Sequence, residues 1–229
     1  RWRFRNGQIY WCLQKIIQEK KMGKNIVKVA LFGLGRIGQM HAKNLISHPK
    51  FKLISVYDID KNLSKKLSKK FKCLNIENPN IAMKDKNTDV IFIATSTSTH
   101  LKFIEQAVKN KKIVFCEKPL DLTLEKIEKC KRKIKKYNPK IQIGFNRRYD
   151  PGHKLLRKNL LKGKIGNLEK IIITSRDPSP PSIDYLKTSG GIFKDMMIHD
   201  FDLARYYAGK DEFVSIFATG SNLHDKKFN

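Results

Sequence analysis

Three polar residues of this chain have types and positions suited to acid–base chemistry: Lys118, Asp195 and His199. Asp195 and His199 are four residues apart in a segment expected to be helical, so they share one helix face and can point into one cleft. Imidazole is the usual general base near neutral pH, and a carboxylate can orient it. Taken alone, a lysine at a strand end is usually solvated, and an Asp/His pair usually lies on a helix surface. Whether these three residues are catalytic therefore depends on the other motifs of the chain.

A glycine-rich segment has the spacing of a phosphate-binding loop. Gly33, Gly35 and Gly38 form a GxGxxG motif directly after an apolar strand-like run and directly before a helical segment. In such a loop the first glycine allows the tight turn, the second lets the backbone approach a pyrophosphate, and the third permits close helix–strand packing. A ligand-free glycine turn is the alternative.

The residues around this loop favour a dinucleotide, and NAD over NADP. Arg36 and Ile37 begin the following helix, whose free N–H groups and dipole suit phosphates. Asp58 ends the next apolar run, where it is placed to accept hydrogen bonds from the adenosine ribose and to repel a 2′-phosphate. Arg36 and Lys61 are nearby cations that act against this preference.

The elements needed to position these residues alternate regularly over about residues 24–145. Apolar runs typical of buried strands alternate with helical segments, which predicts a doubly wound parallel sheet, an α/β dinucleotide-binding domain of the Rossmann type. The expected strands are 26–33, 51–58, 89–95, 112–117 and 140–145, and the expected helices are 36–48, 61–71, 97–110 and 123–137. Thr95, Ser96 and Thr97 then lie at a strand's carboxyl end, where such sheets bind ligands, although helix capping explains them equally.

The pattern changes after Asp150-Pro151, and the sequence predicts a second, α+β substrate domain. Helices are expected over 153–163 and 192–208, strands over 168–176 and 212–220, with a loop between residues 177 and 191. Two such strands would leave unpaired edges, so we expect this domain to be incomplete. The predicted domains are an N-terminal extension outside the fold (1–21), a nucleotide domain (24–147) and a partial catalytic domain (148–229).

The extension is basic and aromatic and begins with Arg, which favours Met22 as the true start; a mitochondrial presequence is the alternative. No apolar run is long enough to span a membrane. The four cysteines are widely spaced, which excludes a disulfide scaffold and a metal site and indicates a cytoplasmic protein. Cys116 is interpreted as a buried thiol at a strand end.

The charge needs its own explanation, because 48 Lys and Arg against 21 Asp and Glu give 229 residues a net charge of +27. Such a chain will bind polyanions through its charge. However, lysine far outnumbers arginine and is spread along the whole chain, whereas nucleic-acid recognition favours clustered arginines and aromatics. We therefore expect a compositional bias and no specific nucleic-acid partner.

Four motifs in order resemble the Gfo/Idh/MocA oxidoreductase family, nearest to its inositol 2-dehydrogenase branch. They are GLGRIG at 33–38, EKP at 117–119, GFNRRYD at 144–150 and GGIFKDMMIHDFD at 190–202. The resemblance implies NAD-dependent oxidation of a secondary alcohol of a cyclic polyol, such as myo-inositol or a related inositol or sugar, to a ketone. It also implies a cis Lys118-Pro119 bond.

The same resemblance assigns roles to single residues. It makes His199 the general base, has Lys118 bind and polarise the reacting hydroxyl, and has Asp195 bind substrate or orient the base. Arg147 and Asp177 are expected substrate contacts. The cofactor-binding set is completed by His100, Glu117 and Lys118, although His100 could equally be a helix-start contact.

The chain departs from the family pattern in length, because family members are typically longer and form homo-oligomers. A truncated NAD(P)-binding regulator without turnover therefore remains an alternative. A dehydrogenase acting on another sugar is a second alternative, and a basic nucleic-acid-binding protein is a third.

Overall fold

The computed structural model describes residues 26–221 and divides after Asp150 into two compact units. The predicted extension 1–21 lies outside the described residues. The first unit carries the glycine-rich loop and Lys118, and the second carries Asp195 and His199. Each unit is described by itself below.

The first unit contains one six-stranded sheet whose strands are all parallel. Its strands are β1 (Val27–Phe32), β2 (Phe51–Tyr57), β3 (Leu74–Asn75), β4 (Val90–Ile93), β5 (Ile113–Cys116) and β6 (Ile141–Ile143). The strand order is β3-β2-β1-β4-β5-β6, so the chain changes direction across the sheet between β1 and β4. Ligands of doubly wound sheets bind outside the carboxyl ends of the strands at that switch point.

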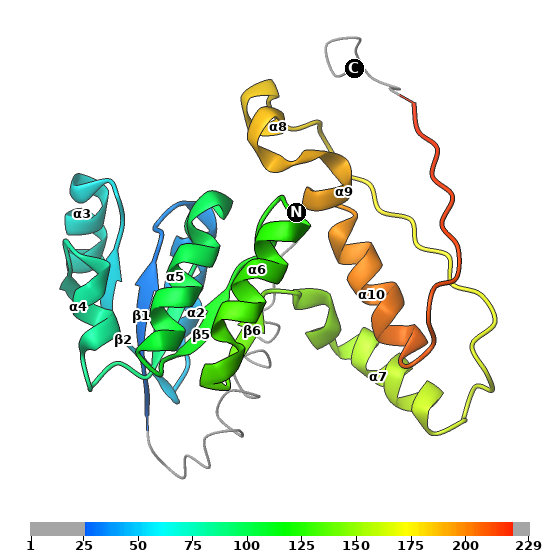
Figure 1. The fold of residues 1–229 in the computed structure, drawn as a ribbon, viewed down its shortest axis with the longest axis horizontal. Helices are drawn as coiled ribbons and strands as arrows, with labels where there is room; N and C mark the ends of the chain where they lie inside the picture. The colour runs from blue at the N-terminus through cyan, green and yellow to red at the C-terminus, as the bar shows by residue number, and fades with distance from the viewer. Residues whose placement is uncertain (1–25, 222–229) are drawn as a thin grey trace. The chain divides into compact units, whose positions relative to one another are not determined.

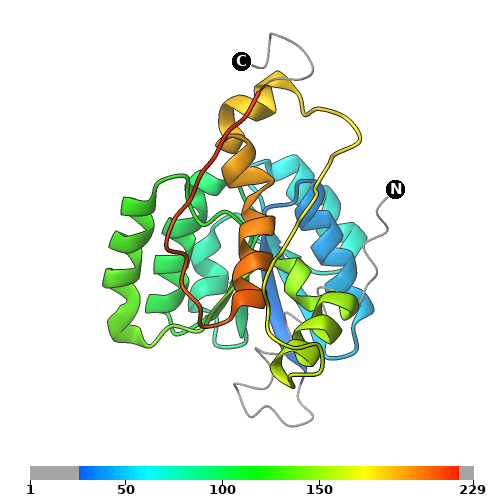
Figure 2. The same ribbon diagram turned by 90° about the vertical axis from the view of Figure 1, so that its right-hand side faces the viewer.

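Helices cover both faces of this sheet. They are α2 (Arg36–Ser47), α3 (Lys61–Phe71), α4 (Pro79–Lys84), α5 (Thr97–Lys109) and α6 (Leu124–Ile134), with the short 3-10 helices η1 (Lys135–Tyr137) and η2 (Asn146–Tyr149). Residues of α2 and α3 pack into one apolar cluster, and residues of α4, α5 and α6 pack into the other. Figures 1 and 2 show these two helical layers with the strands between them.

The strand sequences are continuous apolar runs because both faces of the sheet are buried. Along β1, Val27, Val29 and Leu31 enter one cluster, whereas Ala30 and Phe32 enter the other. Successive side chains of a strand point to opposite faces, so a sheet covered on both sides needs apolar residues at every position. The predicted α/β fold with a parallel sheet is confirmed.

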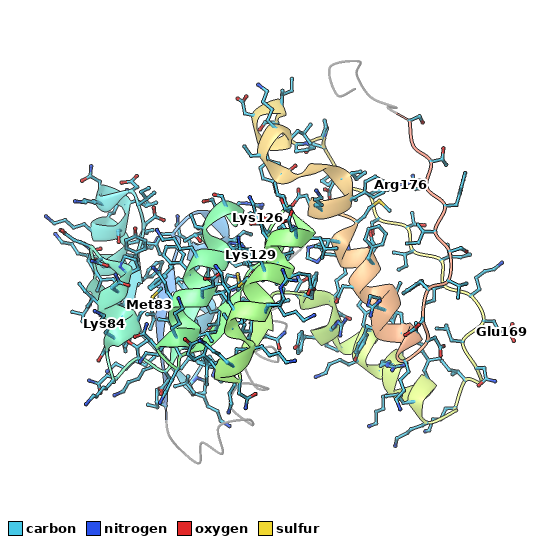
Figure 3. The ribbon with its side chains drawn as sticks, in the orientation of Figure 1. Met83, Lys84, Lys126, Lys129, Glu169 and Arg176 are labelled. Atoms are coloured by element: carbon cyan, nitrogen blue, oxygen red, sulfur yellow. The ribbon has the colours of Figure 1, made fainter. Side chains whose placement is uncertain are left out.

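The lysines lie mostly on the outer faces of the helices. In α6, Cys130 and Ile134 are buried, whereas Lys126 and Lys129 are exposed (Figure 3). The short helix α4 shows the same division, with Met83 buried and its neighbour Lys84 exposed (Figure 3). Helices of this kind have an apolar stripe facing the core and a charged face in solvent.

In the first unit the structure adds one strand and one α-helix that the sequence analysis did not predict, β3 and α4. Strand β3 has two residues and pairs with β2 at the edge of the sheet. Helix α4 begins after Asn78, whose side chain accepts from the Asn80 N–H, and has Pro79 at its first position. Such short elements carry too few periodic positions to be recognised, but Asn followed by Pro was a usable signal for a helix start.

The only regular elements among the described residues of the second unit are helices, joined by long irregular segments, and the two predicted strands are wrong. Its helices are α7 (Pro151–Leu161), α8 (Ile183–Ser189), α9 (Gly191–Asp195) and α10 (Ile198–Ala208). Helix α8 lies inside the segment 177–191 that the sequence analysis predicted to be a loop, and Ser182 caps it by accepting from the Tyr185 N–H. Residues 168–176 and 212–220 are not assigned as strands and do not pair with another strand in the described part of this unit. The apolar pattern can specify an extended chain, but a strand also needs a partner for its backbone N–H and C=O groups.

Helices α7 and α10 pack on each other through polar and aromatic groups. The Nδ1 atom of His153 lies 2.6 Å from the Tyr207 hydroxyl, and Arg157 donates to the Tyr207 carbonyl oxygen at 2.8 Å. The Arg157 guanidinium also lies over the ring of Tyr206. These contacts fix the carboxyl-terminal half of α10, the helix that begins beside His199.

Candidate active site

The glycine-rich loop has the shape that each of its glycines requires. Gly33 has φ +89°, and a Cβ atom there would collide with the Ala94 carbonyl after β4. A Cβ on Gly38 would collide with the Gly33 carbonyl oxygen, whereas a Cβ on Gly35 would meet no atom within 4 Å. Two glycines therefore serve packing, and Gly35 leaves open space over the loop.

The start of α2 is shaped to receive an anion. Gly35 is the N-cap and supplies no side chain, so the first N–H groups, including those of Arg36 and Ile37, have no side-chain cap. Uncapped N–H groups and the positive end of the helix dipole bind phosphate. The open space at Gly35 lies at this point, so the residues present fit a dinucleotide pyrophosphate.

Asp58 joins the end of β2 to the glycine-rich loop. One of its carboxylate oxygens accepts from the Leu34 N–H at 2.6 Å, and the other accepts from the Asp60 N–H at 2.9 Å. A carboxylate can accept about four hydrogen bonds. The two backbone contacts thus orient Asp58 and leave acceptor capacity for ribose hydroxyls.

The Ser/Thr run after β4 begins helix α5. Ser96 is the N-cap, but its side chain makes no cap hydrogen bond. The Thr95 and Thr99 hydroxyls lie 2.7 Å apart, and Thr99 also donates to the Ser96 carbonyl oxygen. Thr97 is the first helical residue. Capping by the Ser96 side chain therefore does not account for this segment.

Two histidines are buried around the EKP segment, and one of them is His100, for which the sequence analysis left two roles open. His100, 1% exposed, has Nδ1 2.8 Å from the Pro119 carbonyl oxygen and Nε2 3.0 Å from that of Thr95. His41, on α2, is 2% exposed and has Nε2 2.6 Å from the Glu117 carboxylate.

Lys118 follows β5 at the carboxyl edge of the sheet, the edge that also carries the glycine-rich loop. It is half-buried, and its bond to Pro119 is cis, as the family resemblance implies. The Lys118 N–H donates to the Glu117 carboxylate at 3.2 Å. The Glu117 side chain, which also contacts His41, therefore forms a hydrogen bond with the main chain at Lys118.

Asp195 and His199 lie on either side of an irregularity, and the single predicted helix over 192–208 is two helices. Asp195 is the last residue of α9 and His199 is the second residue of α10. Between them the Met197 N–H donates to the Ile192 carbonyl, one residue beyond the α-helical partner. Such wide turns recur at functional sites because they redirect side chains. Both residues are half-buried.

The predicted substrate contacts lie on irregular segments. Arg147 is half-buried in η2, after β6, and Asp177 is exposed. The Ser175 hydroxyl donates to Asp200 of α10 at 2.7 Å, which ties the segment just before Asp177 to the helix that carries His199. Ser175 was not singled out in the sequence, and an isolated serine gave no signal.

The described cysteines are free thiols with raised pKa values. Burial raises the pKa of Cys116 well above its usual range, and burial raises the pKa of Cys73 and Cys130 to about 11. Cys116 is completely buried at the end of β5, as predicted. Within residues 26–221 no group of three or more His, Cys, Asp or Glu is placed to hold a metal ion, and no helix could cross a membrane.

The sheet has six parallel strands, and at its switch point lies a glycine-rich loop with open space for a pyrophosphate. These two features define a dinucleotide-binding protein of the Rossmann class. Residues 27–145 match an oxidoreductase family described as having an NAD-binding Rossmann fold, and residues 153–229 match the C-terminal domain of the same family. The chain therefore belongs to the Gfo/Idh/MocA oxidoreductase family. This confirms the predicted family and the predicted NAD-binding domain.

Two curated relatives share about two residues in five with this chain. Inositol 2-dehydrogenase of Rhizobium meliloti is 40% identical over 200 residues, which are 87% of this chain and 60% of that protein. Myo-inositol 2-dehydrogenase of Thermotoga maritima is 40% identical over 205 residues, 88% of this chain and 60% of that protein. The chain thus spans about 60% of the length of these relatives.

Solved structures of dehydrogenases are also similar to this chain. A probable dehydrogenase from Thermotoga maritima has a TM-score of 0.83 and 39% identity, covering 88% of this chain and 61% of that one. Scyllo-inositol dehydrogenase from Lactobacillus casei, solved with NAD(H) and scyllo-inositol, has a TM-score of 0.70 and 31% identity, covering 80% and 56%. The likeness to inositol dehydrogenases therefore extends from sequence to fold.

Proposed function

We propose that this protein is an NAD-dependent dehydrogenase that oxidises a secondary alcohol of a cyclic polyol, myo-inositol or a related inositol or sugar, to a ketone. The observation that carries the proposal is the position of Lys118. Lys118 follows β5 at the carboxyl edge of the sheet, the same edge that carries the glycine-rich loop between β1 and α2. The names of the relatives and the scyllo-inositol bound to one of them support a polyol substrate.

The first unit would hold the cofactor. The N–H groups at the start of α2 bind the pyrophosphate over Gly35, and Asp58 accepts from the adenosine ribose hydroxyls. Thr95 to Thr97 and the EKP segment, at the carboxyl ends of β4 and β5, border the nicotinamide half. Bound NAD supplies the acceptor for the hydride that leaves the substrate carbon.

The remaining steps belong to side chains of this chain. The Lys118 ammonium donates a hydrogen bond to the reacting oxygen and polarises it, and the His199 imidazole accepts the proton of that hydroxyl. Asp195 orients the imidazole or accepts from a neighbouring hydroxyl. Arg147 and Asp177 bind further hydroxyls, a role that hydrogen-bonding and charged groups suit in polyol recognition. A cytoplasmic location, consistent with the free thiols of the described residues, is part of the same proposal.

The proposal is tested by following reduced-nicotinamide absorbance with the full chain, NAD or NADP, and a panel of myo-inositol, scyllo-inositol and glucose. Turnover with NAD and one polyol is expected. Lys118→Met should lower kcat about 100-fold or more, because it removes the polarising cation. Lys126→Met, at an exposed lysine of α6, is the matched control and should leave kcat unchanged.

Two results would contradict the proposal in different ways. NAD binding without turnover on any substrate would identify a nucleotide-binding regulator. A folded protein that binds neither NAD nor NADP, but binds DNA with a steep dependence on salt, would favour the polyanion-binding alternative.

A further inference from the structure

A buried polar contact connects the nucleotide-binding helix to the segment that carries Lys118. Helix α2, whose start forms the anion site, presents His41 to Glu117, with Nε2 2.6 Å from one carboxylate oxygen. The other carboxylate oxygen accepts from the Lys118 N–H at 3.2 Å. The Glu117 side chain thus contacts α2 and the Lys118 main chain at once.

The surroundings show that this contact is built into the fold. The His41 ring packs on Phe92 of β4 and Phe115 of β5, with centroids 4.4 and 5.7 Å away, and is 2% exposed. Its Nδ1 atom has no hydrogen-bond partner among residues 26–221. The imidazole therefore directs its polar interaction to Glu117, and an N–H on Nε2 can donate to the facing carboxylate oxygen.

Gly144, directly after β6, completes the enclosure of the carboxylate. A Cβ atom at this position would lie 2.9 Å from Oε2 of Glu117 and 3.0 Å from Oε1. The Glu117 side chain is 19% exposed, so the protein keeps a carboxylate in a largely covered place. Covering a carboxylate is destabilising unless its hydrogen bonds are made, and the contacts with His41 and with the Lys118 N–H are the ones that Glu117 makes here.

We propose that Glu117 is a positioning residue for Lys118: held by His41 and accommodated by Gly144, its carboxylate fixes the main chain from which the Lys118 side chain extends. This inference rests on the proposed function, in which Lys118 binds the reacting hydroxyl. Through His41, it also couples the position of Lys118 to the helix that would receive the pyrophosphate.

The test uses four variants of the full chain. Glu117→Ala removes the carboxylate, Glu117→Gln keeps its shape and one acceptor oxygen, and Gly144→Ala displaces the carboxylate without removing it. Glu128→Ala, which removes a partly exposed glutamate paired with Lys131, is the control. Three quantities are measured for each: kcat with the best polyol, the NAD dissociation constant, and hydrogen–deuterium exchange of the peptide containing the Lys118 amide.

Glu117→Ala should lower kcat by about 30–100-fold, because a misplaced catalytic group costs about that much. The NAD dissociation constant should change less than about threefold, because the proposed positioning role replaces the cofactor-binding role that the sequence analysis expected of Glu117. Exchange of the Lys118 amide should rise at least about tenfold, because it loses its acceptor. Gly144→Ala should change kcat and exchange in the same directions. Glu117→Gln should retain kcat within about fivefold, and the control should match the wild type.

Each other result counts against the proposal. Unchanged kcat and exchange in Glu117→Ala would overturn it, and so would a kcat loss equally large in Glu117→Gln. A large rise in the NAD dissociation constant would make Glu117 a cofactor-binding residue instead. If the wild type shows no turnover, the proposed function is wrong, yet the exchange measurement still decides whether Glu117 fixes Lys118.

Discussion

The buried imidazole of His100 connects helix α5 to the EKP segment, with Nδ1 2.8 Å from the Pro119 carbonyl oxygen and Nε2 3.0 Å from that of Thr95. A neutral imidazole has one N–H, so it can donate to only one of these oxygens at a time, whereas a protonated ring donates to both. Either way, two main-chain carbonyls beside the proposed nicotinamide site depend on this side chain.

Replacing His100 by phenylalanine should therefore destabilise the fold. A planar aromatic ring is kept, although it is larger than imidazole, and the Thr95 and Pro119 carbonyls lose their donor while the site stays buried. We expect the free energy of unfolding to fall by about 2 kcal/mol, measured by urea denaturation. His100→Gln, whose amide carries two N–H donors, should lose less. Equal losses in both variants would show that packing, and not hydrogen bonding, is what His100 contributes.

Gly35→Ala and Gly38→Ala alter the same motif but should affect different properties: the first should weaken NAD binding and the second should lower stability. Gly35 has φ −62° and open space, so alanine should leave the melting temperature unchanged but weaken NAD binding about tenfold or more by occupying the pyrophosphate position. Gly38→Ala places a methyl group against the Gly33 carbonyl and should cost about 1–3 kcal/mol of stability.

Calorimetric titration with NAD and thermal unfolding separate these two effects. Gly220→Ala, at an exposed glycine with open space in the second unit, is the matched control for both measurements. If Gly35→Ala binds NAD as tightly as the wild type, the dinucleotide does not lie over this loop.

The nucleotide domain could be predicted from the sequence because its signals are local and agree with one another. Strand β1, the glycine motif, α2 and Asp58 follow in one continuous stretch, and each predicts the next. The contact of His41 with Glu117 joins residues 76 positions apart. No periodicity specifies a contact at that distance, although the position of His41 on the buried side of α2 was a usable signal.

The second unit was harder to predict because its apolar runs need partners that a local pattern cannot supply. Ile171 and Ile173 are half-buried and Ile172 is exposed, so the alternation of a strand is present without strand pairing. The separation of α9 from α10 between Asp195 and His199 depends on one displaced backbone hydrogen bond, and the composition of Met196 and Met197 gives no sign of it.

Asp58 should determine the choice between NAD and NADP. Asp58→Asn keeps an acceptor oxygen for the Leu34 N–H but removes the charge that repels a 2′-phosphate. We expect the ratio of NADP to NAD affinity to rise about tenfold or more, measured by titration with each cofactor, because one unpaired charge contact is worth about that much. Asp121→Asn, at a half-buried aspartate that accepts a nearby backbone N–H, is the control. An unchanged ratio would place the ribose away from Asp58.

The buried thiols should make the fold less stable at high pH. Burial raises the pKa of Cys73 and Cys130 from 9.0 to about 11, so the folded chain keeps these thiols protonated where the unfolded chain ionises. Their contribution to stability is complete below about pH 9 and is lost as the pH rises toward about 11, since only the unfolded state releases the proton in that window.

Lysines also titrate in this range, so the effect must be isolated by comparison. The free energy of unfolding of the wild type and of Cys130→Ala is measured by urea denaturation across this pH window. The wild type should lose stability more steeply than the variant, because the variant lacks one of the two thiols with a raised pKa. Parallel curves would mean that Cys130 ionises equally in both states, and therefore that its environment in the folded protein is more open to water than the packing of α6 indicates.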